Sequence, residues 1–330
     1  MRFIIYGAGA IGGVIGAGLC RQDEEVVVIA RGAHGAAISR GGLRVETPDE
    51  TFTVTPAVVS EPKEISFRDG DVVLLAVKSQ DTSQALAALS MVAPPSTTIV
   101  CAQNGVENER IALRLFRDVY GVCVVGGTYY LEPGVVSTQT SPIYGSLDFG
   151  RYPSGMDEKG EQISDALAVA GWLIFNRDDV MRWKHTKLLR NLVLAVQALC
   201  GPNMRQGPFF DLARREGELC LDAAGIAFVG NEEWNSARAL GPAVALPPGG
   251  HSLGGSSWQS LARGTGSIES AFLNGEIMLL GRQHGIPVPA NELLYDLGVK
   301  AAATGQVPGS MTEEELFLLL AARATPEMPS

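Results

Sequence analysis

Hydrophobic and polar positions along the first 31 residues follow the order strand, glycine turn, helix, strand. The apolar run Arg2 to Tyr6 leads directly into Gly7-Ala8-Gly9-Ala10-Ile11-Gly12-Gly13, and a helical pattern of small residues follows. A second apolar run, Glu25 to Ile29, comes next. Glycines in the G-x-G-x-x-G spacing between a strand and a helix predict a dinucleotide-binding unit.

Each glycine of this turn has a separate expected role. Gly7 permits the tight turn, Gly9 leaves the backbone open to a pyrophosphate, and Gly12 allows the helix to pack close to the strand. Free N–H groups and the helix dipole favour the phosphates at the helix N-terminus. The alternatives are a flexible glycine loop and a signal peptide, but the polar run Arg21 to Glu25 and the strand after it argue against the latter. We therefore expect the cofactor to contact Gly7, Ala8, Gly9, Ala10, Ile11 and Gly12.

The residue after the second strand indicates which dinucleotide is bound. NAD-binding units carry a carboxylate about 20 positions beyond the glycines. Here Arg31 stands 19 positions after Gly12. A guanidinium can hold a 2′-phosphate through charge-assisted hydrogen bonds, so Arg31 predicts NADP(H). The alternative is an ordinary solvated arginine at a strand end.

Two later apolar runs are typical of central parallel strands, which are buried on both faces. They are Asp71 to Val77 and Thr97 to Ala102. The first ends at Lys78 and the second leads into Asn104. Ligands of open parallel sheets bind at the carboxyl ends of the strands, where Gly7 and Arg31 are also expected. Taken singly, Lys78 fits a solvated cation and Asn104 a turn, but together the four predict one cofactor site.

Shorter patterns complete a first domain. A meander of strands is expected over Leu43 to Glu46 and Phe52 to Val58. An antiparallel extension of the sheet is expected over Val122 to Tyr130, Gly134 to Thr140 and Ile143 to Leu147. A helix over Glu161 to Ala170 and a last strand over Gly171 to Asn176 then put the domain boundary near Arg177.

Beyond Arg177 the pattern is helical. The expected helices are Asp178 to Cys200, Phe209 to Ala223, Trp258 to Gln283 and Asn291 to Ala303. The Gly- and Pro-rich piece Gly241 to Gly255 is expected to be a loop or an insertion. Thr312 to Glu315 resembles a capping box before a leucine run, which would either dock on the domain or mediate a dimer contact. The sequence thus predicts an α/β domain over residues 1–177 and an all-α domain over 178–330.

Composition narrows the possible partners. The chain has 330 residues, 46% of them hydrophobic, and a net charge of −10 without clustered basic residues. Nucleic acids and anionic membranes are therefore not expected as partners. The five cysteines form no C-x-x-C pair and are expected as reduced thiols of a cytoplasmic protein, and the four histidines lack ligand spacing, so no metal site is expected. No apolar run is long enough to span a membrane.

A candidate proton donor lies on the first helix of the second domain. Lys187 and Asn191 are separated by four positions and so share a helix face. A lysine whose pKa is lowered by burial can donate a proton to a developing alkoxide near neutral pH. The alternative is a solvated cationic face.

These motifs together resemble the ketopantoate reductase family, and the resemblance covers nearly the whole chain in order. The later motifs that carry it are W-x-x-x-K-L-x-x-N over Trp183 to Asn191, Ser256-Ser257, Glu269 five residues before Asn274-Gly275, and Gly285-Ile286-Pro287-Val288-Pro289 with Asn291. The resemblance implies an N-terminal Rossmann-type NADP-binding domain and a helical domain like the C-terminal domain of 6-phosphogluconate dehydrogenase. It also implies NADPH-dependent reduction of 2-dehydropantoate to pantoate, in the route to pantothenate and coenzyme A, by a monomer or homodimer.

Residue roles follow from the same resemblance. Lys187 matches the proton-donating lysine and Glu269 its acidic partner. Asn191 and Ser257 match substrate-holding residues. Arg31 and Lys78 match contacts to the 2′-phosphate, and Asn104 would lie between the nicotinamide and the substrate.

Three positions depart from the family pattern. Ala195 and Gly254 stand where asparagines are common, and Leu261 stands where aspartate is usual. Loss of groups that hydrogen-bond a hydroxylated substrate can change selectivity strongly. Two alternatives therefore stay open: an NADPH-dependent reductase of a different branched 2-oxoacid, and a non-catalytic NADP(H)-binding regulator.

Overall fold

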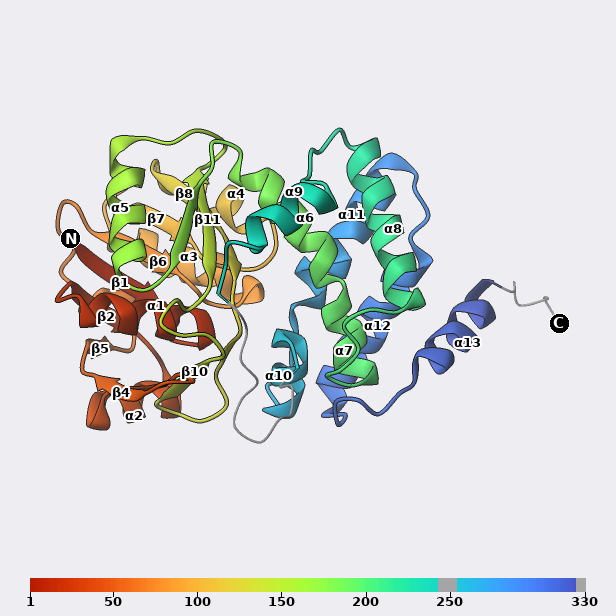
Figure 1. Cartoon of the computed structure of the whole chain (residues 1–330), viewed down its shortest axis with the longest axis horizontal. Helices are drawn as coiled ribbons and strands as arrows, with labels where there is room; N and C mark the ends of the chain where they lie inside the picture. The colour runs from red at the N-terminus through yellow and green to blue at the C-terminus, as the bar shows by residue number, and fades with distance from the viewer. Residues whose placement is uncertain (243–253, 325–330) are drawn as a thin grey trace. The chain divides into compact units, whose positions relative to one another are not determined.

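The computed structural model describes residues 1–242 and 254–324. Its chain forms two compact units, which Figure 1 draws with the element labels used below. Unit 1 comprises Met1–His185 and Val229–Gly250, and unit 2 comprises Thr186–Phe228 and His251–Ser330. The boundary between two domains that the sequence places near Arg177 stays a prediction. The mixed α/β architecture with a helical C-terminal part agrees with the sequence.

Unit 1 is built on an eight-stranded sheet with the strand order β12-β11-β8-β7-β6-β1-β2-β5. The neighbouring strands β8-β7-β6-β1-β2-β5 run parallel to one another, whereas β11 pairs with β8 in the antiparallel direction. The antiparallel extension predicted for this sheet is therefore present at β8 and β11. The strands of the sheet are β1(Arg2–Tyr6), β2(Glu25–Ile29), β5(Ala57–Val59), β6(Val72–Leu75), β7(Thr98–Cys101), β8(Val119–Val125), β11(Ser146–Arg151) and β12(Leu173–Asn176).

Both faces of this sheet are covered, which explains why its central strands are continuous apolar runs. Along β1, Phe3 and Ile5 join one core cluster with α1(Ala10–Arg21) and α5(Glu158–Val169). Ile4 joins a second cluster on the other face, with α3(Thr82–Ser90) and α4(Asn108–Leu113). Alternate residues of a strand point to opposite faces, so a strand covered on both sides has no polar face.

A second, four-stranded sheet of unit 1 was not predicted. Its order is β4-β3-β10-β9, with β3(Leu43–Glu46), β4(Thr51–Val54), β9(Thr128–Tyr129) and β10(Val135–Thr138). The expected meander is correct for the β3–β4 hairpin, but β5 leaves it and pairs with β2 in the large sheet. Strands β9 and β10 likewise do not extend the large sheet. The pairing of β10 with β3 joins distant segments, which local patterns do not specify.

One helix from beyond the expected boundary also belongs to unit 1. In α9(Asn231–Arg238), Arg238 donates to Ser146 Oγ on β11 at 2.9 Å and pairs with the fully buried Asp148. The Arg238 guanidinium also stacks on the Trp234 ring at 4.2 Å. These contacts hold α9 against the large sheet. Helix α6(Val180–Asn191) continues from residues of unit 1 into unit 2.

Unit 2 is helical, but two helices predicted as long are interrupted. The pattern over 178–200 gives α6 and α7(Val193–Cys200), which are separated at Leu192. The pattern over 258–283 gives α10(Ser256–Ala262), a 3-10 turn η3(Glu269–Phe272) and α11(Asn274–His284). Gly264 and Gly266 cause the second break because both adopt positive φ, which ends a helix. The prediction of one helix over 258–283 was wrong.

The remaining helices of unit 2 agree with the sequence. They are α8(Pro208–Ala223) and α12(Pro289–Thr304), followed by α13(Glu313–Ala324). The predicted capping box is present: Glu315 N donates to Thr312 Oγ1 at 3.2 Å, and Thr312 N donates to Glu315 Oε2 at 2.7 Å. Helix α13 docks within the unit, with Leu316 fully buried and Phe317 edge-on to Phe209.

Most of the predicted loop over 241–255 lies outside the described residues. Among residues 1–242 and 254–324, no helix is long and apolar enough to cross a membrane.

Candidate functional site

The glycine turn lies between β1 and α1, and two of the three glycines of its G-x-G-x-x-G motif have no room for a larger residue. Gly7 has φ +102°, and a Cβ there would meet Val77 N at 2.8 Å. A Cβ on Gly12 would meet Gly7 O at 2.1 Å, so the helix packs directly on the turn. At Gly9 a Cβ would meet nothing within 4 Å. The open space at Gly9, the N-cap of α1, fits an approaching pyrophosphate.

No side chain caps the start of α1, and its first turn carries no acidic residue. The first N–H groups of a helix lack partners within the helix. In α1 the first of these N–H groups belong to Ala10 and Ile11, which directly follow Gly9 and its open space. This backbone therefore suits a negatively charged group.

A buried histidine that the sequence did not single out supports the same turn. His34, on α2(Gly32–Gly41), lies 2.7 Å through Nε2 from Ala8 O. The backbone N–H of Gly134 donates to His34 Nδ1 at 2.9 Å. Since Nδ1 is an acceptor, the ring proton is on Nε2 and is donated to Ala8. His34 thus connects the turn to the loop that precedes β10 in the second sheet.

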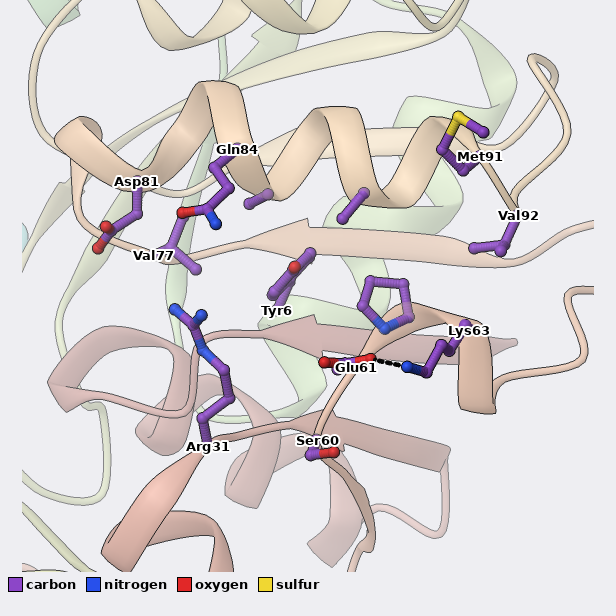
Figure 2. Close-up of a pocket in the computed structure, with 13 residues that line it drawn as sticks. Tyr6, Arg31, Ser60, Glu61, Lys63, Val77, Asp81, Gln84, Met91 and Val92 are labelled. Carbon is purple, nitrogen blue, oxygen red and sulfur yellow. Dashed lines mark ion pairs between the residues drawn. The ribbon is translucent and has the colours of Figure 1, made fainter.

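A pocket of about 330 Å³ opens beside Arg31 in unit 1 (Figure 2). Arg31 is the N-cap of α2, immediately after β2, and its side chain extends toward Val77 in Figure 2. Burial raises the pKa of the Tyr6 hydroxyl, which lines the pocket, while the Arg31 charge opposes that rise. The apolar lining is contributed by Pro62, Val77, Ala85, Ala88, Met91 and Val92.

Charges of both signs line this pocket. Besides Arg31 it contains Asp81, and Glu61 forms an ion pair with Lys63 (Figure 2). An apolar wall suits the flat face of an adenine ring, and Arg31 suits a phosphate on the ribose. The pocket therefore combines an apolar wall with a cationic side chain, as the adenosine end of a dinucleotide requires.

The residues expected at strand ends lie along one edge of the sheet, here called the carboxyl edge. Gly7, Arg31, Lys78 and Asn104 follow β1, β2, β6 and β7, which are neighbours in the order β7-β6-β1-β2. Ser79 Oγ donates to Asn104 O at 3.0 Å, so the loops after β6 and β7 are joined. Lys78 and Asn104 are both partly exposed.

A buried ion pair next to the loop that carries Asn104 was not predicted from the sequence. Lys184, on α6, pairs with Glu109, on α4, and their side chains are 2% and 0% exposed. Lys184 Nζ also donates to Gln103 O at 3.2 Å. Burial raises the pKa of the Glu109 carboxyl, and Lys184 opposes that rise. The signal available in the sequence was a second lysine next to Trp183, but nothing indicated Glu109 as its partner.

The catalytic and substrate residues expected in the second domain belong to unit 2. Lys187 and Asn191 lie on α6, and both side chains are partly exposed. Ser257 lies on α10 with 2% exposure, and Glu269 begins η3 with 3% exposure. A carboxylate at such low exposure is unusual unless it is paired. The roles of these four residues stay predictions.

The three departures from the family pattern have different surroundings. Ala195 on α7 is buried at 2% exposure, and Leu261 on α10 at 9%. At Gly254 a Cβ would lie 2.4 Å from the indole of Trp258. Trp258 therefore occupies the space that an asparagine side chain at position 254 would need.

Within residues 1–242 and 254–324, no group of three or more His, Cys, Asp or Glu side chains could hold a metal ion. The five cysteines are free thiols.

The fold and the glycine turn define a dinucleotide-binding protein, and the comparisons identify its family. Residues 3–154 match the family described as ketopantoate reductase PanE/ApbA, and residues 179–301 match its C-terminal domain. The chain belongs to the ketopantoate reductase family. Members of this family are oxidoreductases that act on a CH–OH group and use a nicotinamide cofactor.

Named relatives agree with this assignment. The 2-dehydropantoate 2-reductase of Halobacterium salinarum is 28% identical over 315 residues, 90% of this chain and 97% of the relative. That of Pyrococcus horikoshii is 31% identical over 191 residues, which span 58% of this chain and 61% of the relative.

Solved structures share the fold. A ketopantoate reductase from Ralstonia eutropha JMP134 superimposes with a TM-score of 0.77 at 29% identity, covering 93% of this chain and all of that one. D-mandelate dehydrogenase, in a ternary complex with NADH and anilino(oxo)acetate, has a TM-score of 0.78 at 19% identity, with coverage of 93% and 100%. The second likeness concerns the fold alone.

Proposed function

We propose that this protein reduces 2-dehydropantoate to pantoate with NADPH, as a step toward pantothenate and coenzyme A. The observation that carries the proposal is the carboxyl edge: the open space at Gly9 and the polar ends at Lys78 and Asn104 follow neighbouring strands, in a chain of this family. The edge provides the backbone N–H groups and the charge that a nicotinamide dinucleotide needs.

The nicotinamide cofactor supplies the hydride, so the protein must supply the proton and hold the substrate. We assign the proton to Lys187 Nζ, which donates it to the alkoxide that develops from the 2-oxo group. Glu269, a buried carboxylate, orients the ammonium and the substrate hydroxyl by charge-assisted hydrogen bonds. Asn191 and Ser257 hold the substrate, and Asn104 contacts the substrate and the nicotinamide.

The test is NADPH oxidation with 2-dehydropantoate and with a panel of branched 2-oxoacids. Turnover should be fastest with 2-dehydropantoate, and Lys187→Ala should lower kcat at least ~100-fold, since a positioned general acid typically contributes that much. Lys300→Ala is the matched control, because Lys300 is an exposed lysine on another helix of unit 2. No oxidation with any 2-oxoacid would exclude the proposal and favour a non-catalytic NADP(H)-binding protein.

We further propose that the cofactor is NADPH rather than NADH, with Arg31 and Lys78 as the contacts to the 2′-phosphate. The Arg31 side chain beside the pocket supports this proposal (Figure 2). Arg31→Ala should weaken NADPH binding at least ~10-fold and leave NADH binding within about twofold. Equal weakening of both cofactors would show that Arg31 does not bind the 2′-phosphate.

A second candidate is the reduction of a different 2-oxoacid. The observation that favours it is Gly254, where the resemblance to the family implies an asparagine: the indole of Trp258 lies 2.4 Å from the place of a Cβ there. Buried groups that bind a substrate hydroxyl reject analogues that lack it, and their loss removes that discrimination. A higher kcat/KM for a 2-oxoacid without a terminal hydroxyl than for 2-dehydropantoate would establish this candidate.

A further inference from the structure

The position of Asn104 depends on a network of buried side chains. Asn108 Nδ2 and Ser79 Oγ both donate to Asn104 O, at 2.8 and 3.0 Å. Thr82 Oγ1 donates to Asn108 Oδ1 at 2.7 Å, and Gln103 Nε2 donates to Val77 O at 2.8 Å. Side chains thus hold the loops after β6 and β7 where the backbone ladder between these strands has ended.

The buried Lys184–Glu109 pair contacts the same loop from behind. Lys184 Nζ donates to Gln103 O at 3.2 Å, and this carbonyl belongs to the peptide unit whose N–H is that of Asn104. The Lys184 ammonium therefore fixes the orientation of the peptide plane that immediately precedes Asn104. The hydrogen bonds to Asn104 O fix the peptide plane that follows it.

Stability alone does not explain a charged pair at this depth. Removing two charges from water costs several kcal/mol per ion, and well-packed apolar residues often stabilise a protein as much as such a pair. Glu109 Oε2 and Gln103 Oε1 are buried without a hydrogen-bond partner, so Glu109 is compensated by Lys184 through its other oxygen. The chain also makes room for the carboxylate with a glycine inside a strand: a Cβ on Gly121 of β8 would lie 3.3 Å from Glu109 Oε1.

We propose that Lys184 and Glu109 are positioning residues that hold the Gln103–Asn104 peptide, and thereby Asn104, in the orientation needed for the reaction. The inference rests on the proposed function, in which Asn104 contacts the nicotinamide and the substrate. Neither Lys184 nor Glu109 touches the reactants in this proposal. Lys184 is committed to Glu109 and Gln103, which separates its role from that assigned to Lys187, three positions later on the same helix.

The decisive variant removes both charges, because a single substitution would leave an uncompensated buried charge. Lys184→Met/Glu109→Met should fold and should bind NADPH within threefold of the wild type. Its kcat/KM for the 2-oxoacid should fall at least tenfold. Asn104→Ala should cost little further activity in this background although it lowers kcat/KM in the wild type, because coupled residues are not additive.

A matched control is the buried pair at the opposite edge of the sheet. Arg2 and Asp71 have side-chain exposures of 9% and 1%. Arg2→Met/Asp71→Asn removes both charges and keeps an acceptor for Arg68 N. If the Lys184–Glu109 pair is only structural, both double variants should change the melting temperature alone, and that outcome would overturn the proposal.

A second readout does not need activity. Hydrogen exchange of the amides over 103–108 should accelerate at least tenfold in Lys184→Met/Glu109→Met and should stay at the wild-type rate in the Arg2–Asp71 control. Unchanged exchange in the first variant would contradict the proposal. A wild type that turns over no 2-oxoacid would instead exclude the proposed function, and the exchange rates would still decide whether the pair holds this loop.

Gly121→Ala covers the case in which the double variant does not fold. It keeps both charges but places a methyl group against the Glu109 carboxylate and Val180. It should accelerate exchange over 103–108 and lower kcat/KM at least threefold. Wild-type exchange and activity in Gly121→Ala would count against the proposal.

Discussion

The two ends of the parallel strands in the large sheet of unit 1 differ in how far their buried polar atoms are hydrogen-bonded. At the amino edge, where the parallel strands begin, Arg2 forms a bidentate pair with Asp71 at 2.8 and 2.6 Å and also donates to Ser66 O at 2.8 Å. The Asp71 carboxylate accepts a further bond from Arg68 N. At the carboxyl edge, Glu109 Oε2 and Gln103 Oε1 are buried without partners.

The buried charges at the amino edge have their hydrogen bonds satisfied, whereas buried polar atoms in the loops of the carboxyl edge do not. A buried charge with all its hydrogen bonds satisfied stabilises the packing and needs nothing further. Buried polar groups left unsatisfied are costly, so they persist where another requirement maintains them. The carboxyl edge also carries the glycine turn, where Gly9 leaves open space beside the backbone. Four substitutions test this comparison, and they are ordered by the size of the expected effect.

Gly12→Ala should cause the largest loss of stability. A Cβ at 2.1 Å from Gly7 O and 2.9 Å from Ala76 Cβ cannot be accommodated unless α1 moves away from β1. We expect the free energy of unfolding to fall by more than ~3 kcal/mol, in the range of severe overpacking. Denaturant unfolding measures the change. A loss below ~1 kcal/mol would show that the helix does not depend on this close approach.

Arg2→Met should destabilise the amino edge without affecting the cofactor. It leaves the Asp71 carboxylate buried with 1% exposure and without its guanidinium. Removing one partner of a buried pair typically costs about 3 kcal/mol. The KM for NADPH should stay unchanged, since Arg2 lies at the opposite end of β1 from the glycine turn. A changed KM would mean that the two edges are not independent.

His185, the neighbour of Lys184 on α6, should make the stability of the fold sensitive to acid. Burial lowers the pKa of its imidazole from the ordinary 6.5 to about 4, and the neighbouring Lys184 charge acts in the same direction. The folded state therefore favours the neutral ring, while the unfolded chain binds a proton below pH 6.5. This contribution to stability is complete above pH 6.5 and is lost as the pH falls toward 4.

The loss at pH 4 should be at most about 3 kcal/mol, because the ring is partly accessible to water. His185→Gln should flatten this part of the curve of unfolding free energy against pH. The measurement is the difference between variant and wild type at each pH, which cancels the titration of shared carboxylates. A constant difference between pH 7 and 4 would refute the assignment to His185.

Gly9→Ala should have the smallest effect on stability and a selective effect on the cofactor. A Cβ at Gly9 meets nothing within 4 Å, and the residue has φ −66°, which alanine adopts without strain. The unfolding free energy should stay within ~0.5 kcal/mol of the wild type. The methyl group would occupy the space assigned to the pyrophosphate, so NADPH affinity should fall at least ~10-fold, or about 1.4 kcal/mol. Unchanged affinity would move the phosphates away from Gly9.

The parts of the molecule that the sequence predicted well are those with local signals. The glycine turn and the strands that precede Lys78 and Asn104 are marked by continuous apolar runs and by the residues that follow them. The capping box at Thr312 is likewise contained in four positions. The break over 258–283 also has a local signal, in Gly264 and Gly266, although the pattern on either side of it is helical.

The missed features all join residues that are far apart in the chain. Strand β10 pairs with β3, and Lys184 pairs with Glu109, 75 positions earlier. A charged residue in a sequence reads as exposed until its partner is known, because burial of one charge is acceptable only beside the other. Such pairs are decided by the packing of whole elements, which the pattern of one segment does not contain.

His34 connects the predicted cofactor-binding turn to the small second sheet. Its hydrogen bonds to Ala8 O and from Gly134 N join the glycine turn to the loop before β10, so the small sheet restrains the turn. A loop that must be ordered when its ligand arrives loses affinity, whereas a loop that is already ordered does not. In the proposed function, the small sheet contributes to affinity by preorganisation, because it sets the shape of the turn before the dinucleotide binds.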